Sequence, residues 1–278
     1  MIKEEDWVVF QDMKSKEWLR QITLEGFLDT HRGKILFSDV IGKEYGSVVP
    51  YSKGSGRIIL LEPNLKHIQQ YMPHATNIIY NMDASLLCFK ANIKRGNNVL
   101  EIGTGSGGLT LYIATFLYEY PDSNKNDSGI TPIITVDNKS DHQNIAKKNL
   151  KNFKLDHMVD FRLGDFEEVN PLLDLPEQYF DAIFIDLATP WLIINKIHKY
   201  LKYGKSVLIF VPNWGQIEKT VIEAEMNRNY HVLEVLEVFS RPMIIDGIRN
   251  VTRPLTRAII YSGVIIHLVR KKEYQDKK

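Results

Sequence analysis

Four glycines lie at positions 103, 105, 107 and 108, directly after the apolar run of residues 99–102. A second apolar run with helical character begins at Leu109. A strand that enters a glycine turn at the start of a helix presents backbone N–H groups to a ligand. Glycine allows this because it accepts a positive φ and has no side chain to hold the ligand away. We therefore expect Gly103, Gly105, Gly107 and Gly108 to bind a nucleotide-like ligand; a tight turn without a ligand is the alternative.

The charge beside this turn indicates which kind of ligand it binds. No Gly-Lys-Ser/Thr sequence follows the glycines, so a P-loop is not supported. Glu101 stands just before Gly103, where its carboxylate would repel a pyrophosphate and attract a sulfonium or an amino group. A cationic ligand is therefore favoured, and a dinucleotide is the alternative.

Three aspartates follow three further apolar strands. Asp137 follows residues 133–136, Asp165 follows residues 159–164, and Asp186 follows residues 180–185. The carboxyl ends of parallel strands line one crevice in a doubly wound sheet, so we expect these acids beside the glycine turn, with Asp137 on ribose hydroxyls. Taken singly, Asp137 and Asp165 could instead be helix N-caps.

An alternation of strands and helices is needed to position these residues. The sequence predicts a small β-rich module over residues 1–62, with strands at 7–10, 20–24, 33–37 and 46–49. An α/β domain follows over residues 63–278, with a surface loop at 120–131 and a terminal antiparallel hairpin. Its helices are expected at 63–72, 83–91 (with Asp83 at or near the N-cap), 109–118, 140–153, 191–201 and 215–228, and its strands at 99–102, 133–136, 159–163, 180–185, 206–211, 232–240 and 258–269.

Composition narrows the functional classes. The chain has 278 residues, and its 44% hydrophobic content is ordinary for a protein with a proper core. Its single cysteine, Cys88, can build neither a disulfide framework nor a zinc site, which predicts a reducing, cytoplasmic location without a metal. The net charge of +1 means that an RNA partner would need a local basic patch. No signal-peptide pattern and no apolar run of about 20 residues is present, so no membrane partner is expected.

Several motifs together resemble one enzyme family. E-x-G-x-G-x-G at residues 101–107 resembles the first motif of class I S-adenosylmethionine (AdoMet) methyltransferases. T-H-R-G-K-I at 30–35, D-V-I-G-K-E-Y-G-S at 39–47 and I-I-Y-N-M-D at 78–83 resemble the tRNA (adenine-N1)-methyltransferases of the TrmI type. D-L-A-T-P-W at 186–191 is similar to the D-x-x-x-P-W motif of that family. The resemblance extends over residues 7–271, to the closing Val269-Arg270-Lys271.

This resemblance implies a class I methyltransferase (Rossmann-like) sheet with AdoMet as cofactor. It also implies 1-methyladenosine formation in the T loop of tRNA, at position 58 and with 57 as a further candidate, by a homo-oligomer, most simply a tetramer. Departures from the family pattern at His74, Asn77, Asn81 and Tyr261 leave the exact base and position open. The family's cofactor contacts fall here on Ile79, Ser106, Gly107, Gly108, Asp137, His142, Asp165, Phe166 and Asp186, in addition to Glu101, Gly103 and Gly105.

The chemistry of the implied substrate assigns a role to Asp186. N1 of adenine already carries a lone pair, so its attack on a methyl group needs no strong base. A carboxylate that accepts from the 6-amino group would orient the base and stabilise the developing positive charge, and Asp186 is the predicted catalytic residue. The target base must leave the folded T loop, and Tyr80 or Trp191 would stack on it; packing is the equal alternative for both. Phosphate contacts are expected from among Lys14, Lys16, Arg20, Lys94, Arg95, Lys147, Lys148 and Lys151.

Two other functions stay open from the sequence. One is a protein or small-molecule methyltransferase of the isoaspartyl carboxyl methyltransferase type, against which the β-rich module and the D-x-x-x-P-W motif argue. The other is a non-catalytic tRNA-binding partner subunit, against which the intact glycines and the three acids argue.

Overall fold

The chain folds into two compact units, 1–72 and 73–278. The computed structural model describes residues 1–118, 131–166, 168, 170–246, 251–256 and 261–272. Helix α1 (Leu65–Tyr71) belongs to the first unit, although the sequence-based boundary after residue 62 leaves it with the second. Its contacts explain this, because Tyr71 Oη donates to Glu17 O at 2.7 Å and His67 Nε2 lies 3.3 Å from the Glu17 carboxylate.

The first unit is built from short antiparallel strands. One sheet has the order β2-β1-β7-β5 and the other has the order β3-β4-β6. Their inner faces share one apolar core, in which Phe10 stacks on Phe37 with ring centroids 5.7 Å apart. The sequence misses β3, β6 and β7 and places β2 a few residues late. The elements are β1 (Trp7–Asp12), β2 (Glu17–Gln21), β3 (Phe27–Thr30), β4 (Gly33–Leu36), η1 (Phe37–Asp39), β5 (Val48–Pro50), β6 (Lys53–Gly54) and β7 (Arg57–Leu61).

The second unit contains a seven-stranded sheet of order β10-β9-β8-β11-β12-β16-β13. The neighbours from β10 to β12 are parallel, whereas β16 is antiparallel to both β12 and β13. This is the doubly wound sheet with a terminal antiparallel pair that the sequence predicts. The strands are β8 (Val99–Ile102), β9 (Ile133–Asp137), β10 (Val159–Leu163), β11 (Phe180–Ile185), β12 (Leu201–Val211), β13 (Tyr230–Glu237) and β16 (Val264–Arg270).

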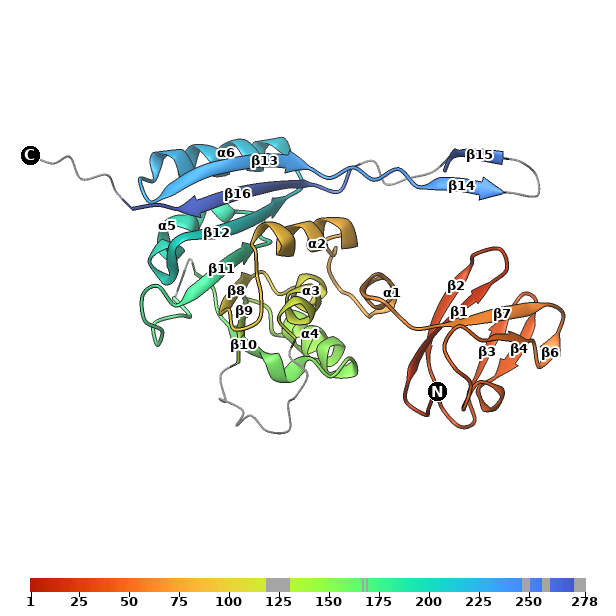
Figure 1. The fold of residues 1–278 in the computed structure, drawn as a ribbon. Coiled ribbons are helices and arrows are strands. Elements are labelled where there is room, and N and C mark those ends of the chain that lie inside the picture. Colours follow the sequence, from red (N-terminus) through yellow and green to blue (C-terminus); the bar gives the residue numbers. More distant parts are fainter. Residues whose placement is uncertain (119–130, 167, 169, 247–250, 257–260, 273–278) are drawn as a thin grey trace, which may run out of the picture. The chain divides into compact units, whose positions relative to one another are not determined.

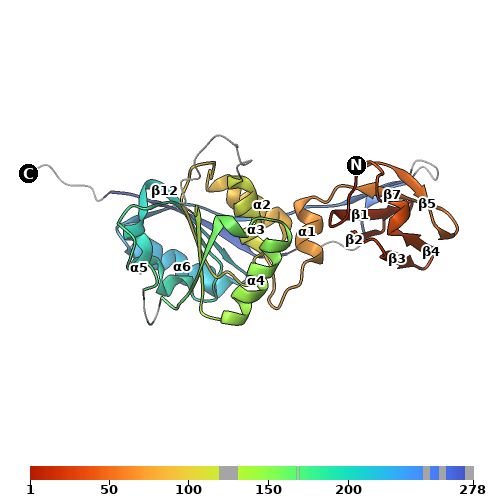
Figure 2. The ribbon, with the colours of Figure 1, turned by 90° about the horizontal axis from the view of Figure 1, so that it is seen from below.

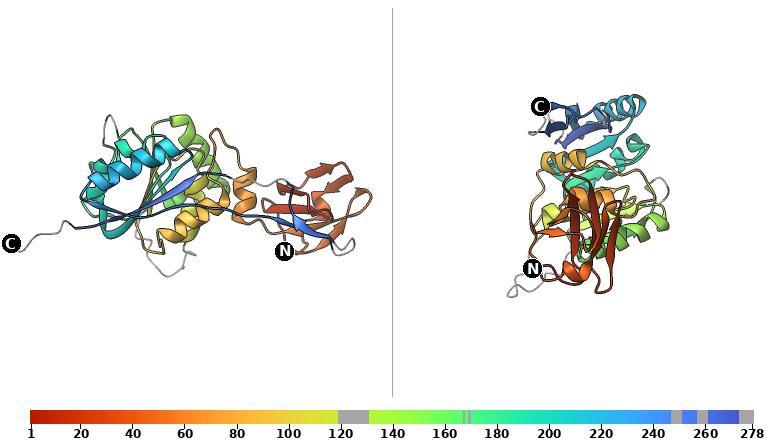
Figure 3. Two further views of the ribbon diagram at one scale, coloured as in Figure 1. Left: turned by 90° about the horizontal axis from the view of Figure 1, so that it is seen from above. Right: turned by 90° about the vertical axis from the view of Figure 1, so that its right-hand side faces the viewer.

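Helices cover both faces of this sheet (Figures 1 and 2). The face that carries Glu101 is covered by α2 (Asn81–Lys90), α3 (Gly108–Leu117) and α4 (Ser140–Asn152). The face that carries Leu100 and Ile102 packs against α5 (Ile194–Ile197) and α6 (Trp214–Met226) in the main hydrophobic core. Figure 3 shows the long strands β13 and β16 running beside α6.

In the second unit, the main departures from the sequence-based elements concern residues 190–200, the start of β12, the N-cap of α2 and the terminal pair of strands. The helix predicted at 191–201 is broken into η3 (Pro190–Leu192), α5 and η4 (His198–Tyr200), in a segment rich in β-branched isoleucine. Strand β12 begins at Leu201, before the predicted start at Ser206. Asp83 is not the N-cap of α2; Tyr80 is, and Asp83 is buried in the first turn. A separate hairpin of β14 (Met243–Asp246) and β15 (Val251–Pro254) interrupts the terminal pair.

Parts of two other predicted elements lie outside the described residues. They are residues 120–130 of the expected surface loop and residues 258–260 of the expected last strand. In the described part of the chain, no helix is both long and apolar enough to cross a membrane.

Candidate cofactor and catalytic site

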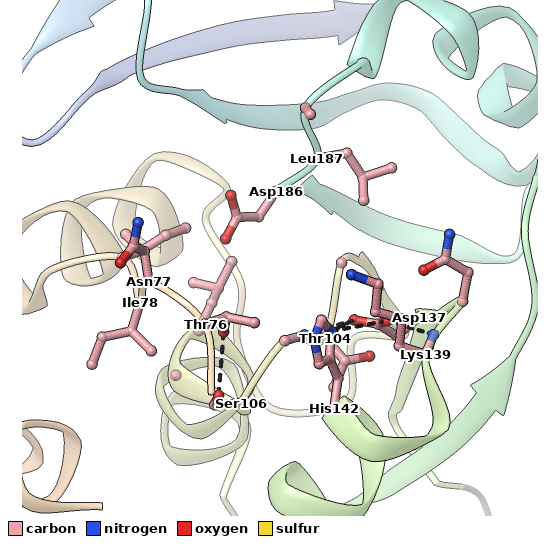
Figure 4. A pocket seen from close by; sticks show the side chains of 17 residues that line it. Thr76, Asn77, Ile78, Thr104, Ser106, Asp137, Lys139, His142, Asp186 and Leu187 are labelled. Carbon is pink, nitrogen blue, oxygen red and sulfur yellow. Dashed lines mark hydrogen bonds and ion pairs between the residues drawn. The ribbon is translucent and has the colours of Figure 1, made fainter. Parts of the chain in front are cut away.

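A pocket of about 280 Å³ opens at the carboxyl ends of β8, β9 and β11 (Figure 4). All of its lining residues belong to the second unit. Among the predicted site residues, the lining includes Ile79, Gly103, Gly105, Ser106, Gly108, Asp137, His142 and Asp186. The fold therefore brings most of the predicted cofactor residues together around one cavity.

The glycine turn fits closely against its surroundings. Gly103 has φ +98°, and a Cβ atom there would lie only 2.2 Å from the backbone oxygen of Asp186. Gly107 is the N-cap of α3 with φ +83°, and a Cβ there would lie 3.1 Å from Ala146 Cβ. Side chains at these positions would push apart the ends of β8 and β11, or α3 and α4. The glycines therefore keep the floor of the pocket open and its backbone accessible.

Asp137 is the last residue of β9 and fixes the side wall beside the turn. Its Oδ2 accepts from Gly105 N and its Oδ1 from Lys139 N, both at 2.9 Å. The ring of His142, in the first turn of α4, places Nδ1 3.3 Å from Oδ1. The backbone N–H groups hold the carboxylate in one orientation, and its remaining lone pairs can accept from the two hydroxyls of a ribose.

Asp186 lies on the opposite side of the floor, immediately after β11. Its backbone N–H donates to Ile102 O at 2.9 Å, which anchors the residue beside β8. The described residues offer its side chain neither a cation nor a hydrogen-bond donor, and burial raises the pKa of Asp186 to about 7. Because a carboxylate in such surroundings is poorly stabilised, it is available to a cation or an N–H donor that enters the pocket.

Glu101 lies beneath the turn and does not line the pocket. It is fully buried, and its Oε2 accepts from Thr110 Oγ1 at 2.6 Å and from Thr135 Oγ1 at 2.7 Å. Its Oε1 has no partner among the described residues. Burial, together with the nearby carboxylates of Asp186 and Asp137, raises the pKa of Glu101 to about 8, although the hydrogen bonds from Thr110 and Thr135 lower it in part. Three carboxyl groups around one turn make this floor attractive to a cationic ligand.

Besides Glu101, five other predicted residues lie outside the pocket lining. Gly107 faces α4, as described above. Asp165 accepts from Asn138 Nδ2 at 3.0 Å, and Asn138 does line the pocket. Phe166 is buried in the main core, where its carbonyl accepts from Lys196 Nζ. Tyr80 is 46% exposed at the start of α2, next to the lining residue Ile79. Trp191 lies in η3 with Lys219 Nζ 5.0 Å from its ring centroid.

The structure also identifies lining residues that the sequence-based prediction misses. The largest group is on the segment before α2, which has no strand or helix pattern to mark it. Ser106 fixes this segment, because its Oγ accepts from Ala75 N at 2.9 Å and lies 3.2 Å from Thr76 Oγ1. The others lie within two residues of predicted ones in the sequence. The missed lining residues are Thr76, Asn77, Ile78, Thr104, Leu109, Asn138, Lys139, Leu187 and Ala188.

The arrangement supports binding of a cationic nucleoside and transfer of a group beside Asp186. Three features lie around one cavity: exposed backbone in the turn, Asp137 as an acceptor for ribose hydroxyls, and the Asp186 carboxyl, which has no partner among the residues that the structure describes. Within the described ranges, no group of three His, Cys, Asp or Glu side chains could hold a metal ion.

Comparisons with known proteins find matching families and related enzymes. Residues 56–259 match the family described as tRNA methyltransferase complex GCD14 subunit, and residues 1–49 match the TrmI-like N-terminal family. The tRNA (adenine(58)-N(1))-methyltransferase TrmI of Thermus thermophilus is 27% identical over 231 residues, which covers 83% of this chain and 84% of that protein. The tRNA (adenine(57)-N(1)/adenine(58)-N(1))-methyltransferase TrmI of Methanocaldococcus jannaschii is 26% identical and covers 91% of each chain.

Solved structures extend the comparison to three dimensions. The tRNA (m1A58) methyltransferase TrmI of Aquifex aeolicus has a TM-score of 0.82 and 27% identity, over 98% of this chain and 99% of that one. A SAM-dependent O-methyltransferase of Thermotoga maritima has a TM-score of 0.84 at 24% identity, over 99% and 96% of the two chains. This second likeness shows the class I methyltransferase fold.

Proposed function

The chain belongs to the tRNA methyltransferase family of the GCD14 subunit, and from this premise we propose that it forms 1-methyladenosine in tRNA with AdoMet as methyl donor. The target is adenosine 58 of the T loop, the position named for the TrmI relative of Thermus thermophilus. Adenosine 57 is a second candidate, because the Methanocaldococcus jannaschii relative is named for both positions. The observation that carries the proposal is the buried Asp186 carboxyl at the pocket floor, which no described side chain pairs, within a family match that covers it.

The pocket residues fit the cofactor. The glycine turn is a cradle that a Cβ would obstruct at Gly103, and Asp137 can accept from ribose hydroxyls. The acidic floor matches a cationic ligand, since Asp137 and Asp186 line the pocket above Glu101. When bound there, AdoMet supplies a methyl group activated by its sulfonium charge. Asn138 continues the wall of Asp137 along the pocket, and its side chain donates to Asp165 just outside the lining.

Asp186 then acts on the target base. Its carboxylate accepts a hydrogen bond from the 6-amino group, which orients N1 toward the methyl group. The same negative charge stabilises the positive charge that develops on the adenine ring as N1 is methylated. No base is needed at N1, because its lone pair is free. Tyr80, exposed beside Ile79, is the better placed of the two predicted stacking residues, and Trp191 lies in η3 after the Asp186 loop.

Exposed lysines on α4 suit an RNA substrate. Lys147, Lys148 and Lys151 are exposed on α4, the helix whose first turn carries His142. Contacts of this kind bind phosphates without reading sequence, so they would position the RNA while the pocket selects the base.

We further propose that the protein works as a homo-oligomer, most simply a tetramer, in the cytoplasm. The hairpin β14–β15 forms a small sheet of its own and exposes Met243 and Ile245. Such an apolar surface favours association between copies. The cytoplasmic location rests on the single buried cysteine, Cys88.

Methylation of an unmodified tRNA transcript tests the proposed function. We expect the purified protein to transfer a methyl group from AdoMet to the transcript, with 1-methyladenosine mapped to position 58. A transcript with guanosine at 58 should lose this product, and residual product would map to 57. Methylation of added protein but not of RNA would contradict the proposal in favour of a carboxyl methyltransferase. Tight tRNA binding without any transfer would instead indicate a non-catalytic subunit.

A further inference from the structure

Asn149 is a buried residue of α4 whose side-chain amide joins two segments that are distant in the sequence. It is 1% exposed, and its Nδ2 donates to Pro73 O at 2.8 Å and to Ser106 O at 2.9 Å. Pro73 opens residues 73–79, which we call the strap, and Ser106 belongs to the glycine turn. One amide group therefore ties the strap to the turn.

The hydrogen bonds fix the orientation of this amide. Carbonyl oxygens only accept, so the NH₂ group of Asn149 must face Pro73 O and Ser106 O. Its Oδ1 is then left buried, with no partner among the described residues. An unpaired buried acceptor is unfavourable, and an apolar side chain of the same size would avoid it. The two hydrogen bonds that Nδ2 donates to Pro73 O and Ser106 O explain why an amide stands here.

Further contacts hold the strap directly over the turn. Ala75 N donates to Ser106 Oγ at 2.9 Å, and Thr76 Oγ1 lies 3.2 Å from the same oxygen. A Cβ atom at Gly105 would lie 3.0 Å from Thr76 Oγ1. Figure 4 shows Thr76, Asn77 and Ile78 on the side of the pocket that faces Asp186. The strap is thus a pocket wall that faces the catalytic carboxyl.

We propose that Asn149 is a positioning residue for methyl transfer: by tying the strap to the glycine turn, it holds the wall of residues 76–79 at a fixed distance from Asp186. The proposal rests on the proposed function, since it assigns this wall the task of keeping cofactor and target base together. Asn149 itself does not line the pocket and acts only through the strap. The same helix also carries His142 beside Asp137, so α4 would position two walls of the pocket at once.

The test compares two near-isosteric exchanges. Asn149→Leu removes both donors and keeps the volume, while Asn152→Leu changes an exposed asparagine on the same helix and is the control. Hydrogen exchange of the peptide that contains Ala75 reports on the strap, and single-turnover methyl transfer to tRNA reports on alignment. We expect Asn149→Leu to accelerate exchange of that peptide and to lower the transfer rate on the order of tenfold, well below its melting temperature. Asn152→Leu should change neither quantity.

A second variant keeps the test decisive if Asn149→Leu does not fold. Thr76→Val loosens the strap from its own side without touching α4, and it should reproduce both effects in weaker form. A merely structural role for Asn149 would lower the melting temperature and leave the transfer rate and strap exchange of the folded protein unchanged; that result would overturn the inference. A wild-type protein without any transfer to tRNA would instead contradict the proposed function, and the exchange data would still decide whether Asn149 ties the strap.

Discussion

At the scale of single residues, the pocket floor concentrates carboxyl groups that the described chain does not neutralise. Glu101 is fully buried between Thr110 and Thr135, and burial raises its pKa to about 8. Burial also raises the pKa of Asp186 to about 7, and no cationic side chain among the described residues pairs with it. Such groups bind a proton more tightly in the folded than in the unfolded state. A cation bound at this site therefore stabilises the folded protein, whereas loss of protons from these carboxyl groups without a cation destabilises it.

The raised pKa of Glu101 makes the stability of the fold depend on pH. Its pKa rises from 4.5 in the unfolded chain to about 8 in the folded one, so its contribution is fully present below about pH 4.5 and is lost as pH rises toward 8. Within that window the loss is at most about 1.4 kcal/mol per pH unit. Glu101→Gln removes the titrating group. The melting temperature of the variant minus that of the wild type should therefore increase as pH rises from 5 to 8.

A control exchange separates this effect from general surface charge. Glu177→Gln alters an exposed glutamate, and its melting temperature should differ from the wild type by a constant amount across the same pH range. A Glu101→Gln protein that differs from the wild type equally at pH 5 and pH 8 would show that Glu101 is not a buried titrating group.

At the scale of elements, the end of β8 and the end of β11 are held together at Gly103. A Cβ there would lie 2.2 Å from Asp186 O, a backbone atom that cannot move without displacing the strand. Gly103→Ala should therefore abolish AdoMet binding in calorimetry and lower the melting temperature. Gly96→Ala is the matched control, because Gly96 has φ +83° with nothing within 4 Å of the added Cβ.

The control separates two causes of damage. Gly96→Ala introduces backbone strain of about 1–3 kcal/mol without a clash, so it should reduce stability and leave AdoMet affinity intact. If Gly103→Ala bound AdoMet as tightly as Gly96→Ala does, the close approach between turn and Asp186 would not be needed for the cofactor site.

The elements also show which parts of the molecule the sequence can predict. Strands with continuous apolar residues that end in an acid, such as those before Asp137 and Asp186, are recognisable because the parallel order makes their ends converge. The strap is not recognisable, since it is irregular and depends on long-range bonds from Ser106 and Asn149. The hairpin β14–β15 is missed for a different reason: its apolar residues are exposed and make no alternating buried face.

Glu101 illustrates a limit of reasoning from residue type. Its position beside the glycines correctly predicts an acidic site, but only the sheet register shows that its side chain turns inward between Thr110 and Thr135. The sequence could not distinguish a carboxylate in the pocket wall from one beneath it. The sequence likewise could not show that the side chain of Phe166 packs in the main hydrophobic core and not in the pocket lining.

At the scale of the whole molecule, a net charge of +1 gives one copy little overall attraction for a long RNA. Association would combine the basic surfaces of several copies, and the exposed hairpin β14–β15 is the candidate contact. Ile245 is 77% exposed, so Ile245→Glu should yield a smaller species than the wild type in light scattering. Leu173→Glu, at a residue that is 73% exposed outside the hairpin, should leave the mass unchanged. A wild-type protein that is a strict monomer while active on tRNA would contradict the predicted assembly.

The central claim is that Asp186 in this pocket carries methyl transfer to N1 of an adenine in tRNA. The most direct test is single-turnover transfer from AdoMet to an unmodified tRNA transcript by the wild type and by Asp186→Asn, with a thermal melt of each protein. The exchange keeps the size of the side chain and removes the negative charge. We predict a rate lower by on the order of 10²–10³, the size expected for loss of a preorganised charge-stabilising group, with a melting temperature that does not fall. A near-normal rate together with a lowered melting temperature would show instead that Asp186 serves only the fold.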